Sequence, residues 1–200
     1  MREEQLFDRY LNELIEWNKK FNLTSITDPD EIKIKHFEDS LTVLQAVDLT
    51  NQKVVDIGAG AGFPGIPLKI VRPEIDLLLV EATRKKVNFL EHLIKVLGLK
   101  KARAVWGRAE DLSRSKEYAG QFDAAVARAV AKLDVLAAYC LPFIRPGGIF
   151  VAMKGPDVEA EVKVADKAVR MLGGSLEKVV SLTLKEGEIK RTLVLIRKTS

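Results

Sequence analysis

The sequence has little of what secreted, membrane-spanning and metal-dependent proteins usually contain. Its 200 residues include one cysteine and two histidines, so an intramolecular disulfide is impossible and a histidine-cysteine metal site is not expected. No apolar run approaches the roughly 20 residues that span a bilayer, and the segment from Met1 to Gln5 lacks the apolar stretch of a signal peptide. We therefore expect a cytoplasmic protein that binds neither a membrane nor a metal.

The charge is unevenly distributed along the chain. Residues 1–50 contain 6 Lys and Arg against 11 Asp and Glu, whereas the rest of the chain carries a net charge of +9. A surplus of positive charge is compatible with a polyanionic partner, although many proteins without such a partner carry as much. Charge alone therefore leaves nucleic acid as one option.

Helical spacing of apolar residues dominates the first part of the chain. The spacing predicts an amphipathic helix from about residue 3 to residue 20. Asp28 followed by Pro29 predicts a second helical start, because aspartate is a good N-cap and proline fits the first helical turn. We expect residues 1–50 to form an acidic helical cap and residues 51–200 to form one compact domain.

Short apolar runs alternate with helical patterns beyond residue 50, which is typical of an α/β fold with a largely parallel sheet between two layers of helices. The last two runs lie close together across 185–188, which predicts a hairpin and an antiparallel last strand in a seven-stranded sheet. The predicted strands are 54–57, 75–80, 102–106, 122–127, 148–153, 179–184 and 192–196, and the predicted helices are 67–71, 84–97, 110–117, 133–141 and 158–172.

A glycine-rich segment follows the first predicted strand. Gly58, Gly60 and Gly62 let the backbone turn tightly and approach a ligand at the carboxyl end of the strand, where doubly wound sheets bind cofactors. The dinucleotide fingerprint needs Gly or Ala where Phe63 stands, and the Gly-Lys-Ser/Thr of a P-loop is missing. These two absences disfavour NAD, FAD and nucleoside triphosphates.

What remains is a cofactor with an adenosine and no pyrophosphate. The pattern from Asp56 to Gly62 resembles motif I of the class I S-adenosylmethionine-dependent methyltransferases, which implies a Rossmann-like fold with Asp56 and the glycines facing the methionine part of the cofactor. Glu81 ends the second strand, where a carboxylate can accept hydrogen bonds from both ribose hydroxyls. Ala109 and Glu110 follow the third strand, where this fold presents groups to the adenine. A glycine in a turn or a solvent-exposed glutamate at a strand end is common in proteins that bind no cofactor. Here the glycine-rich loop, Glu81 and the segment at Ala109 follow three successive strands of one βαβαβ unit, and this order favours a cofactor site.

The sequence lacks two motifs that other nucleic-acid methyltransferases use, which reduces the number of possible methyl acceptors. Methylation of an exocyclic base amine usually employs an Asn/Asp-Pro-Pro-Phe/Tyr loop after the fourth strand, and this chain has Ala127-Arg128-Ala129-Val130 there. Methylation at C5 of a pyrimidine needs a cysteine nucleophile, whereas Cys140 lies on an apolar helical face and is expected in the core. A purine ring nitrogen has a free lone pair and needs neither that loop nor a cysteine nucleophile. Methyl transfer to it can therefore depend mainly on positioning.

Several separated segments together resemble one family, the bacterial small-subunit ribosomal RNA guanine-N7 methyltransferases, also known as glucose-inhibited division protein B. These segments are Asn18 to Thr24, His36 to Ser40, Asp56 to Pro64, Arg108 to Glu110, Ala127 to Ala129, Met153 to Gly155, and Arg191. The resemblance implies S-adenosylmethionine as cofactor, with contacts from Gly58, Phe63, Ala109, Glu110 and Arg128 and with Glu81 at the ribose. It also implies N7-methylguanosine in a decoding-region loop of 16S rRNA as product, 16S rRNA or the 30S subunit as partner, and low-level streptomycin resistance when the enzyme is lost.

Basic residues after the strands are the candidates for holding the RNA. We expect Arg108, Arg128, Lys154 and Arg191 to form a basic rim for phosphates, and the last three to position the substrate. No catalytic base is expected, because N7 has no proton to remove. The alternatives left open are a methyltransferase for another RNA or a small molecule, and a non-enzymatic interaction protein. We expect a monomer.

Several polar residues of the cap, and His92 beyond it, are further candidates. His36 and Asp39 lie one helical turn apart and are interpreted as a capped or hydrogen-bonded structural pair and not as a catalytic base. Asn18 and Asn22 could bind RNA or tie the cap to the cofactor loop, and we favour the second role. His92 is expected to be solvated or to pack between helices.

Overall fold

The protein folds around one seven-stranded sheet. A computed structural model describes residues 2–128, 131–184 and 189–200. The strand order is β3-β2-β1-β4-β5-β7-β6, and β7 runs antiparallel to both of its neighbours while the other pairs are parallel. The strands are β1 (Lys53–Ile57), β2 (Asp76–Glu81), β3 (Ala102–Trp106), β4 (Phe122–Arg128), β5 (Ile144–Lys154), β6 (Gly174–Leu184) and β7 (Ile189–Lys198). The predicted α/β class and antiparallel last strand are confirmed; the connection 185–188 lies outside the described residues.

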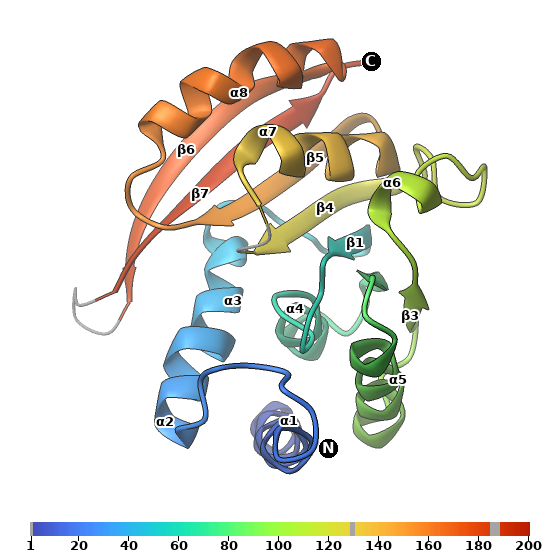
Figure 1. The fold of residues 1–200 in the computed structure, drawn as a ribbon, viewed down its shortest axis with the longest axis vertical. Helices are drawn as coiled ribbons and strands as arrows, with labels where there is room; N and C mark the ends of the chain where they lie inside the picture. The colour runs from blue at the N-terminus through green and yellow to red at the C-terminus, as the bar shows by residue number, and fades with distance from the viewer. Residues whose placement is uncertain (1, 129–130, 185–188) are drawn as a thin grey trace.

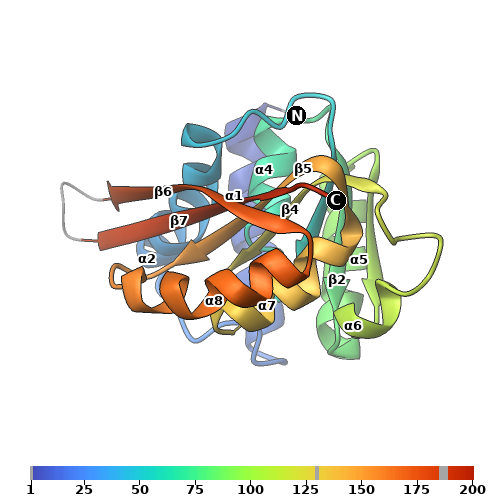
Figure 2. The ribbon, with the colours of Figure 1, turned by 90° about the horizontal axis from the view of Figure 1, so that it is seen from above.

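Helices cover both faces of the sheet (Figures 1 and 2). One face carries α1 (Glu3–Asn18), α2 (Pro29–Ile32), η1 (Lys33–Glu38), α3 (Asp39–Leu41), η2 (Thr42–Gln45), α4 (Gly65–Val71) and α5 (Arg84–Leu97). The other face carries α6 (Ala109–Leu112), α7 (Leu133–Cys140), η3 (Leu141–Phe143) and α8 (Glu159–Met171). In the described part of the chain, no helix has both the length and the apolar character needed to cross a lipid bilayer.

The sheet is apolar on both faces because successive side chains of a strand point in opposite directions. Leu77 and Leu79 of β2 pack into the cluster beneath α4 and α5, whereas Leu78 and Val80 pack toward α6 and α7. Uninterrupted apolar runs therefore mark the central strands, which is why the sequence reveals them.

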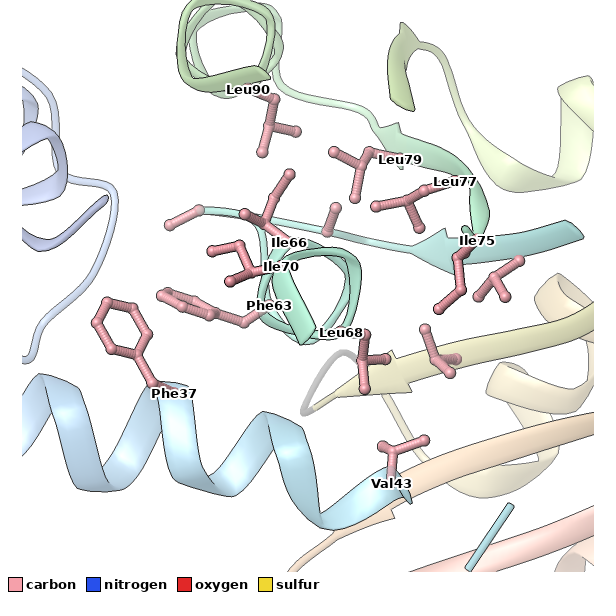
Figure 3. Close-up of a cluster of buried hydrophobic side chains, with 14 of the residues drawn as sticks. Phe37, Val43, Phe63, Ile66, Leu68, Ile70, Ile75, Leu77, Leu79 and Leu90 are labelled. Carbon is pink, nitrogen blue, oxygen red and sulfur yellow. The ribbon is translucent and has the colours of Figure 1, made fainter. Parts of the chain in front are cut away.

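The cap has no core of its own. Tyr10 and Val43 are fully buried, and they belong to the same cluster as Leu79 of the sheet. Figure 3 shows Phe37 from the cap pointing at Phe63 of the glycine-rich segment, and Val43 lying below Leu68 of α4. The Tyr10 hydroxyl also donates a hydrogen bond to the carbonyl of Ala61, at 2.6 Å. The cap is therefore fixed directly on the loop between β1 and α4.

The sequence placed some element boundaries wrongly. The helix expected over 110–117 spans only Ala109–Leu112, and α1 ends at Asn18. Strand β6 begins at Gly174, five residues before the expected 179. Because β6 pairs only with β7 and is largely exposed, polar residues are tolerated in its first half, and a search for apolar runs misses them.

We expect Gly62→Ala to lower the free energy of unfolding by about 2–4 kcal/mol. Gly62 has a φ of +103°, and a Cβ there would lie 2.7 Å from the Tyr10 hydroxyl and 2.9 Å from Ile66. Gly98→Ala is the matched control, since Gly98 also has a positive φ of +64° but has no atom within 4 Å of the added carbon. Its cost should be only about 1 kcal/mol. Urea unfolding followed by circular dichroism measures both, and equal losses would contradict the close packing of the cap on Gly62.

Candidate cofactor and acceptor site

The glycine-rich loop between β1 and α4 is held from two sides. The N–H groups of Gly58 and Ala59 donate to the carbonyl of Val80, at 2.9 and 3.1 Å, which fixes the loop to the end of β2. The N–H of Gly60 donates to Oε2 of Glu81 at 2.9 Å. The loop therefore has a defined shape at the carboxyl edge of the sheet.

A cavity of about 270 Å³ opens between the ends of β1, β2 and β3. We call it the β1–β3 cavity; its lining residues are Ile57, Gly58, Val80, Ala82, Gly107, Arg108, Ala109, Glu110, Ala131 and Tyr139. The sequence predicted Gly58, Ala109 and Glu110 as ligand contacts, and the structure brings them together here. It missed Tyr139, because an aromatic residue in the apolar helix α7 gave no signal beyond core packing.

A smaller cavity of about 150 Å³, the loop cavity, adjoins the glycine-rich loop. It is lined by Leu23, Thr24, His36, Gly58, Ala59, Gly60, Ala61, Phe63 and Arg128. Gly58 lines this cavity and the β1–β3 cavity, so the two are neighbours. Three of the lining residues come from the cap, which therefore supplies one wall.

A third cavity, of about 360 Å³, lies beyond Arg128 and is called the acceptor cavity below. Its lining residues are Ile26, Lys35, His36, Asp39, Arg128, Met153, Lys154, Gly155 and Arg191. Because His36 and Arg128 line both this and the loop cavity, a ligand in one cavity would lie next to a ligand in the other.

A buried ion-pair network stands at that junction. The carboxylate of Asp39 is 2% exposed; its Oδ2 accepts from Nη1 of Arg128 at 3.1 Å, and its Oδ1 from Nε of Arg191 at 2.8 Å. Arg128 also donates to the carbonyl of Lys35, and its guanidinium lies 4.8 Å from the centre of the Phe63 ring. One carboxylate of the cap thus orients an arginine from β4 and an arginine from β7.

His36 and Asp39 both have structural partners, but their side chains do not hydrogen-bond to each other. His36 instead contacts Oγ1 of Thr24 through Nε2 at 2.8 Å and Nη2 of Arg128 through Nδ1 at 3.1 Å, and its ring stacks on Phe63. Burial and the positive charge of Arg128 lower the pKa of His36 to about 4. A neutral imidazole is favoured because burial disfavours the charged ring and because the positive charge of Arg128 lies beside it.

The four predicted basic residues do not form one cluster. Arg128, Lys154 and Arg191 line the acceptor cavity, whereas Arg108 lines the β1–β3 cavity. Lys154 is 2.7 Å from Glu161 of α8 and donates to the carbonyl of Ala131. The sequence missed Glu161, which binds Lys154 and the N–H of Leu133 and so holds the first residue of α7. The Ala129 of the predicted motif lies outside the described residues.

The carboxyl groups at the ends of β1 and β2 are placed differently. Asp56 is fully buried below the loop, where its Oδ2 accepts from the N–H of Gly65 at 2.8 Å and its Oδ1 has no hydrogen-bond partner in the described part of the chain. Burial raises the pKa of Asp56 to about 7. Glu81 lies beside the loop and accepts one backbone N–H at each oxygen, from Gly60 and Thr83. Asp56, Gly62 and Glu81 therefore support the loop and are not among the residues that line its two cavities.

The remaining residues that the sequence singled out lie in the core, at helix contacts or on the surface. The side chain of Asn18 bonds the backbone of Leu23 and Thr24, which positions one wall of the loop cavity, whereas Asn22 is exposed. His92 packs on α1 through Glu13, at 2.7 Å. Cys140 is buried in the core, as predicted. Among residues 2–128, 131–184 and 189–200, no three His, Cys, Asp or Glu side chains are arranged to hold a metal ion.

The cavities suit a nucleoside cofactor. Apolar side chains of Ile57 and Val80 and the ring of Tyr139 line the β1–β3 cavity. Each oxygen of Glu81 accepts one N–H and keeps capacity for a second hydrogen bond, so it can still accept a ribose hydroxyl. A Cβ at Gly60 would meet only the carbonyl of Gly58, at 3.8 Å, so the loop cavity is open at this point because the side chain is absent.

Fold and site together define a class I S-adenosylmethionine-dependent methyltransferase. Solved structures share the fold: M. jannaschii TYW2 in complex with AdoMet has a TM-score of 0.62 at 16% identity, over 81% of this chain and 74% of that chain. YcgJ from Bacillus subtilis has a TM-score of 0.61 at 13% identity, over 82% of this chain and 100% of that chain. At these identities the likeness shows the fold alone.

The sequence is similar to one family over nearly its whole length. The model of the GidB family, rRNA small subunit methyltransferase G, matches residues 3–194, and the chain belongs to this family. Ribosomal RNA small subunit methyltransferase G of Desulforamulus reducens is 50% identical over 96% of this chain and 80% of its own length. The protein of the same name from Clostridium novyi is 44% identical over 96% of this chain and 79% of its own length. The resemblance drawn from the motifs is confirmed.

We expect Asp39→Asn to lower the free energy of unfolding by about 3–5 kcal/mol, because it leaves buried Arg128 without a countercharge. The matched control is Asp166→Asn, which removes an exposed pair with Arg170 on α8 and should cost no more than about 0.5 kcal/mol. Urea unfolding compares the two. A loss in Asp39→Asn no larger than in the control would show that the network does not support the fold.

The low pKa of His36 predicts a pH dependence of stability. Between about pH 4 and the unfolded value of about 6.5, the unfolded chain binds a proton that the folded protein excludes, so the contribution of His36 to stability falls as pH falls through this window. The raised pKa of Asp56 changes stability in the opposite direction, so the contribution of His36 is isolated by comparing the wild type with His36→Gln. The unfolding free energy of the wild type minus that of the variant should rise from pH 4 to pH 6.5.

A direct measurement of the same pKa is available from proton NMR. In His92→Gln the remaining histidine is His36, and it should titrate near pH 4. A midpoint near 6.5 would contradict the buried, neutral state.

Proposed function

We propose that this protein transfers a methyl group from S-adenosylmethionine to N7 of a guanine in the decoding-region loop of 16S rRNA. The observation that carries the proposal is a row of three neighbouring cavities: the loop cavity joins the β1–β3 cavity, which suits a nucleoside, to the acceptor cavity, which Arg128 and Arg191 line. Among the described residues where the loop and acceptor cavities meet, none is free to act as a base. The names of the relatives support small-subunit rRNA as the substrate.

Residues of the glycine-rich loop and of the segment after β3 would hold the cofactor: Gly58, Gly60, Phe63, Ala109 and Glu110. Glu81 would accept hydrogen bonds from the ribose. When bound, S-adenosylmethionine supplies an electrophilic methyl group on a sulfonium. The protein then has to present the guanine at the junction of the loop and acceptor cavities, which is a positioning task.

The groups around the junction suit an acceptor atom that needs no deprotonation. Both ring nitrogens of His36 are engaged by neighbours, and its pKa of about 4 leaves it a weak base. Lys154 is paired with Glu161. Cys140 is fully buried, and burial raises its pKa, so it offers no thiolate for attack on a pyrimidine. N7 of guanine carries a free lone pair and requires none of these groups.

The ion pairs also suit the charge that develops during transfer. Methylation at N7 makes guanine positive, so a cluster of unpaired cations at the acceptor would oppose the reaction. Asp39 cancels one of the two charges on Arg128 and Arg191, and Glu161 cancels that of Lys154. Arg191 and Arg108 are 28% and 73% exposed, which suits them to phosphates, whereas the more buried Arg128 would position the base. We further propose that the protein acts as a monomer in the cytoplasm.

The test is to incubate the protein with methyl-labelled S-adenosylmethionine and either deproteinised small-subunit rRNA or 30S subunits that lack the modification, and then digest the RNA to nucleosides. We expect label in N7-methylguanosine, and activity that falls steeply with salt because phosphate contacts release counterions. Label found only in N2-methylguanosine or methyladenosine would refute the N7 assignment. Activity without RNA would favour a small-molecule methyltransferase.

Gly60→Val supplies the internal control for the cofactor site. A side chain at Gly60 would enter the loop cavity, so we expect no measurable binding of S-adenosylmethionine by calorimetry and no methylation. Gly120→Val is matched to it, because Gly120 has a similar φ of +63° and no atom within 4 Å, and lines none of these cavities. It should bind the cofactor like the wild type. Normal affinity in Gly60→Val would remove the loop from the cofactor site.

A further inference from the structure

Trp106 is an exposed aromatic residue at the edge of the cofactor site. It ends β3, the edge strand of the sheet, and is 56% exposed, whereas every other aromatic side chain in the described ranges is buried or partly buried. The next two residues, Gly107 and Arg108, line the β1–β3 cavity. The indole therefore stands directly beside the place proposed for the cofactor, although it is not among the residues that line that cavity.

The ring is held in place although it is exposed. Its Nε1–H donates to the carbonyl of Ala82 at 2.9 Å, and the guanidinium of Arg84 lies 5.5 Å from the ring centre. A tether at the ring edge and a cation over the ring restrict its rotation. More than half of the residue still remains open to solvent, so an apolar, rigid surface is available for a planar ligand.

The surroundings of Trp106 are positively charged. Arg84 makes no ion pair with any described residue, and Arg108 is 73% exposed. Glu110, the carboxylate paired with Arg108, is 3.9 Å away, which is too far for a strong hydrogen bond. An exposed pair of this kind is weak and leaves Arg108 able to turn toward a phosphate. Arg103 lies on the opposite face of β3, where its guanidinium is 5.9 Å from the centre of the Tyr118 ring.

We propose that Trp106 and Arg84 form a stacking platform for an unpaired base of the RNA substrate, with Arg108 contacting its backbone. Proteins bind single-stranded RNA by stacking its bases on aromatic rings and guanidinium planes within a positively charged track, which is the combination found here. The inference rests on the proposed function and adds a second contact, at the β3 edge, to the acceptor cavity near β4 and β7. The base on the platform would be a neighbour of the methylated guanine in the folded RNA, and not that guanine itself.

The experiment measures RNA and cofactor affinity separately. In Trp17→Phe the only remaining tryptophan is Trp106, and its fluorescence should be quenched by a single-stranded RNA of about ten nucleotides. Trp106→Ala should raise the Kd for this RNA, and lower kcat/KM for small-subunit rRNA, by about five- to 150-fold, while the Kd for S-adenosylmethionine stays unchanged. Trp106→Tyr should recover most of the RNA affinity, because it restores an aromatic face, and it serves if the alanine variant fails to fold. Met171→Ala, another exposed apolar residue at 79%, lies on α8 beside the opposite edge of the sheet and should change nothing.

Three results would overturn the platform. RNA affinity that is the same in Trp106→Ala and the wild type would exclude it and leave the methyltransferase function intact. Weaker cofactor binding with unchanged RNA binding would assign Trp106 to the cofactor. A wild-type protein that neither binds nor methylates rRNA would refute the proposed function and this inference together. The assay of the wild type distinguishes this result from the first one, in which the wild type remains active.

Discussion

The geometry of the site depends on one buried ion pair, between Asp39 of the cap and Arg128 at the end of β4. A guanidinium 14% exposed is costly to bury unless a carboxylate and further acceptors surround it. Asp39 and the carbonyl of Lys35 meet that need, and both belong to the cap. The cap is therefore part of the site, because it supplies the acceptors that hold Arg128 between the loop and acceptor cavities.

The same network reconciles two opposite requirements of the proposed transfer to a guanine ring nitrogen. Positive charge is needed to hold a polyanion, yet it is unfavourable next to a base that becomes positive. The structure separates the two requirements in space. The cations closest to the junction are paired with Asp39 or Glu161, whereas the more exposed Arg108 lies away from it, toward the β3 edge. Net charge is thus a poor guide to this site, and the pairing of each cation is a better one.

Sequence reasoning succeeded where one local rule decides the structure. Apolar runs located the central strands, and the glycine spacing after β1 located the loop, because both signals come from residues adjacent in the chain. It failed where the partner is distant. Tyr10 looked like an ordinary core residue of an amphipathic helix, yet its hydroxyl bonds Ala61, 51 positions away. Arg128 looked like an unpaired cation after a strand, yet its carboxylate partner is Asp39, 89 positions away.

The sequence by itself determined the α/β class, the order of the elements, the glycine-rich loop and the family, because each rests on short-range patterns or on motifs in fixed order. Only the tertiary structure decided which charges are paired. The sequence gives no sign that Lys154, Arg128 and Arg191 differ in how they are paired. In the structure Arg128 pairs with Asp39, 89 positions away, and Arg191 pairs with the same carboxylate, 152 positions away. Such pairings depend on how the cap packs against the sheet, and that packing follows from a core shared by residues distributed over the whole chain.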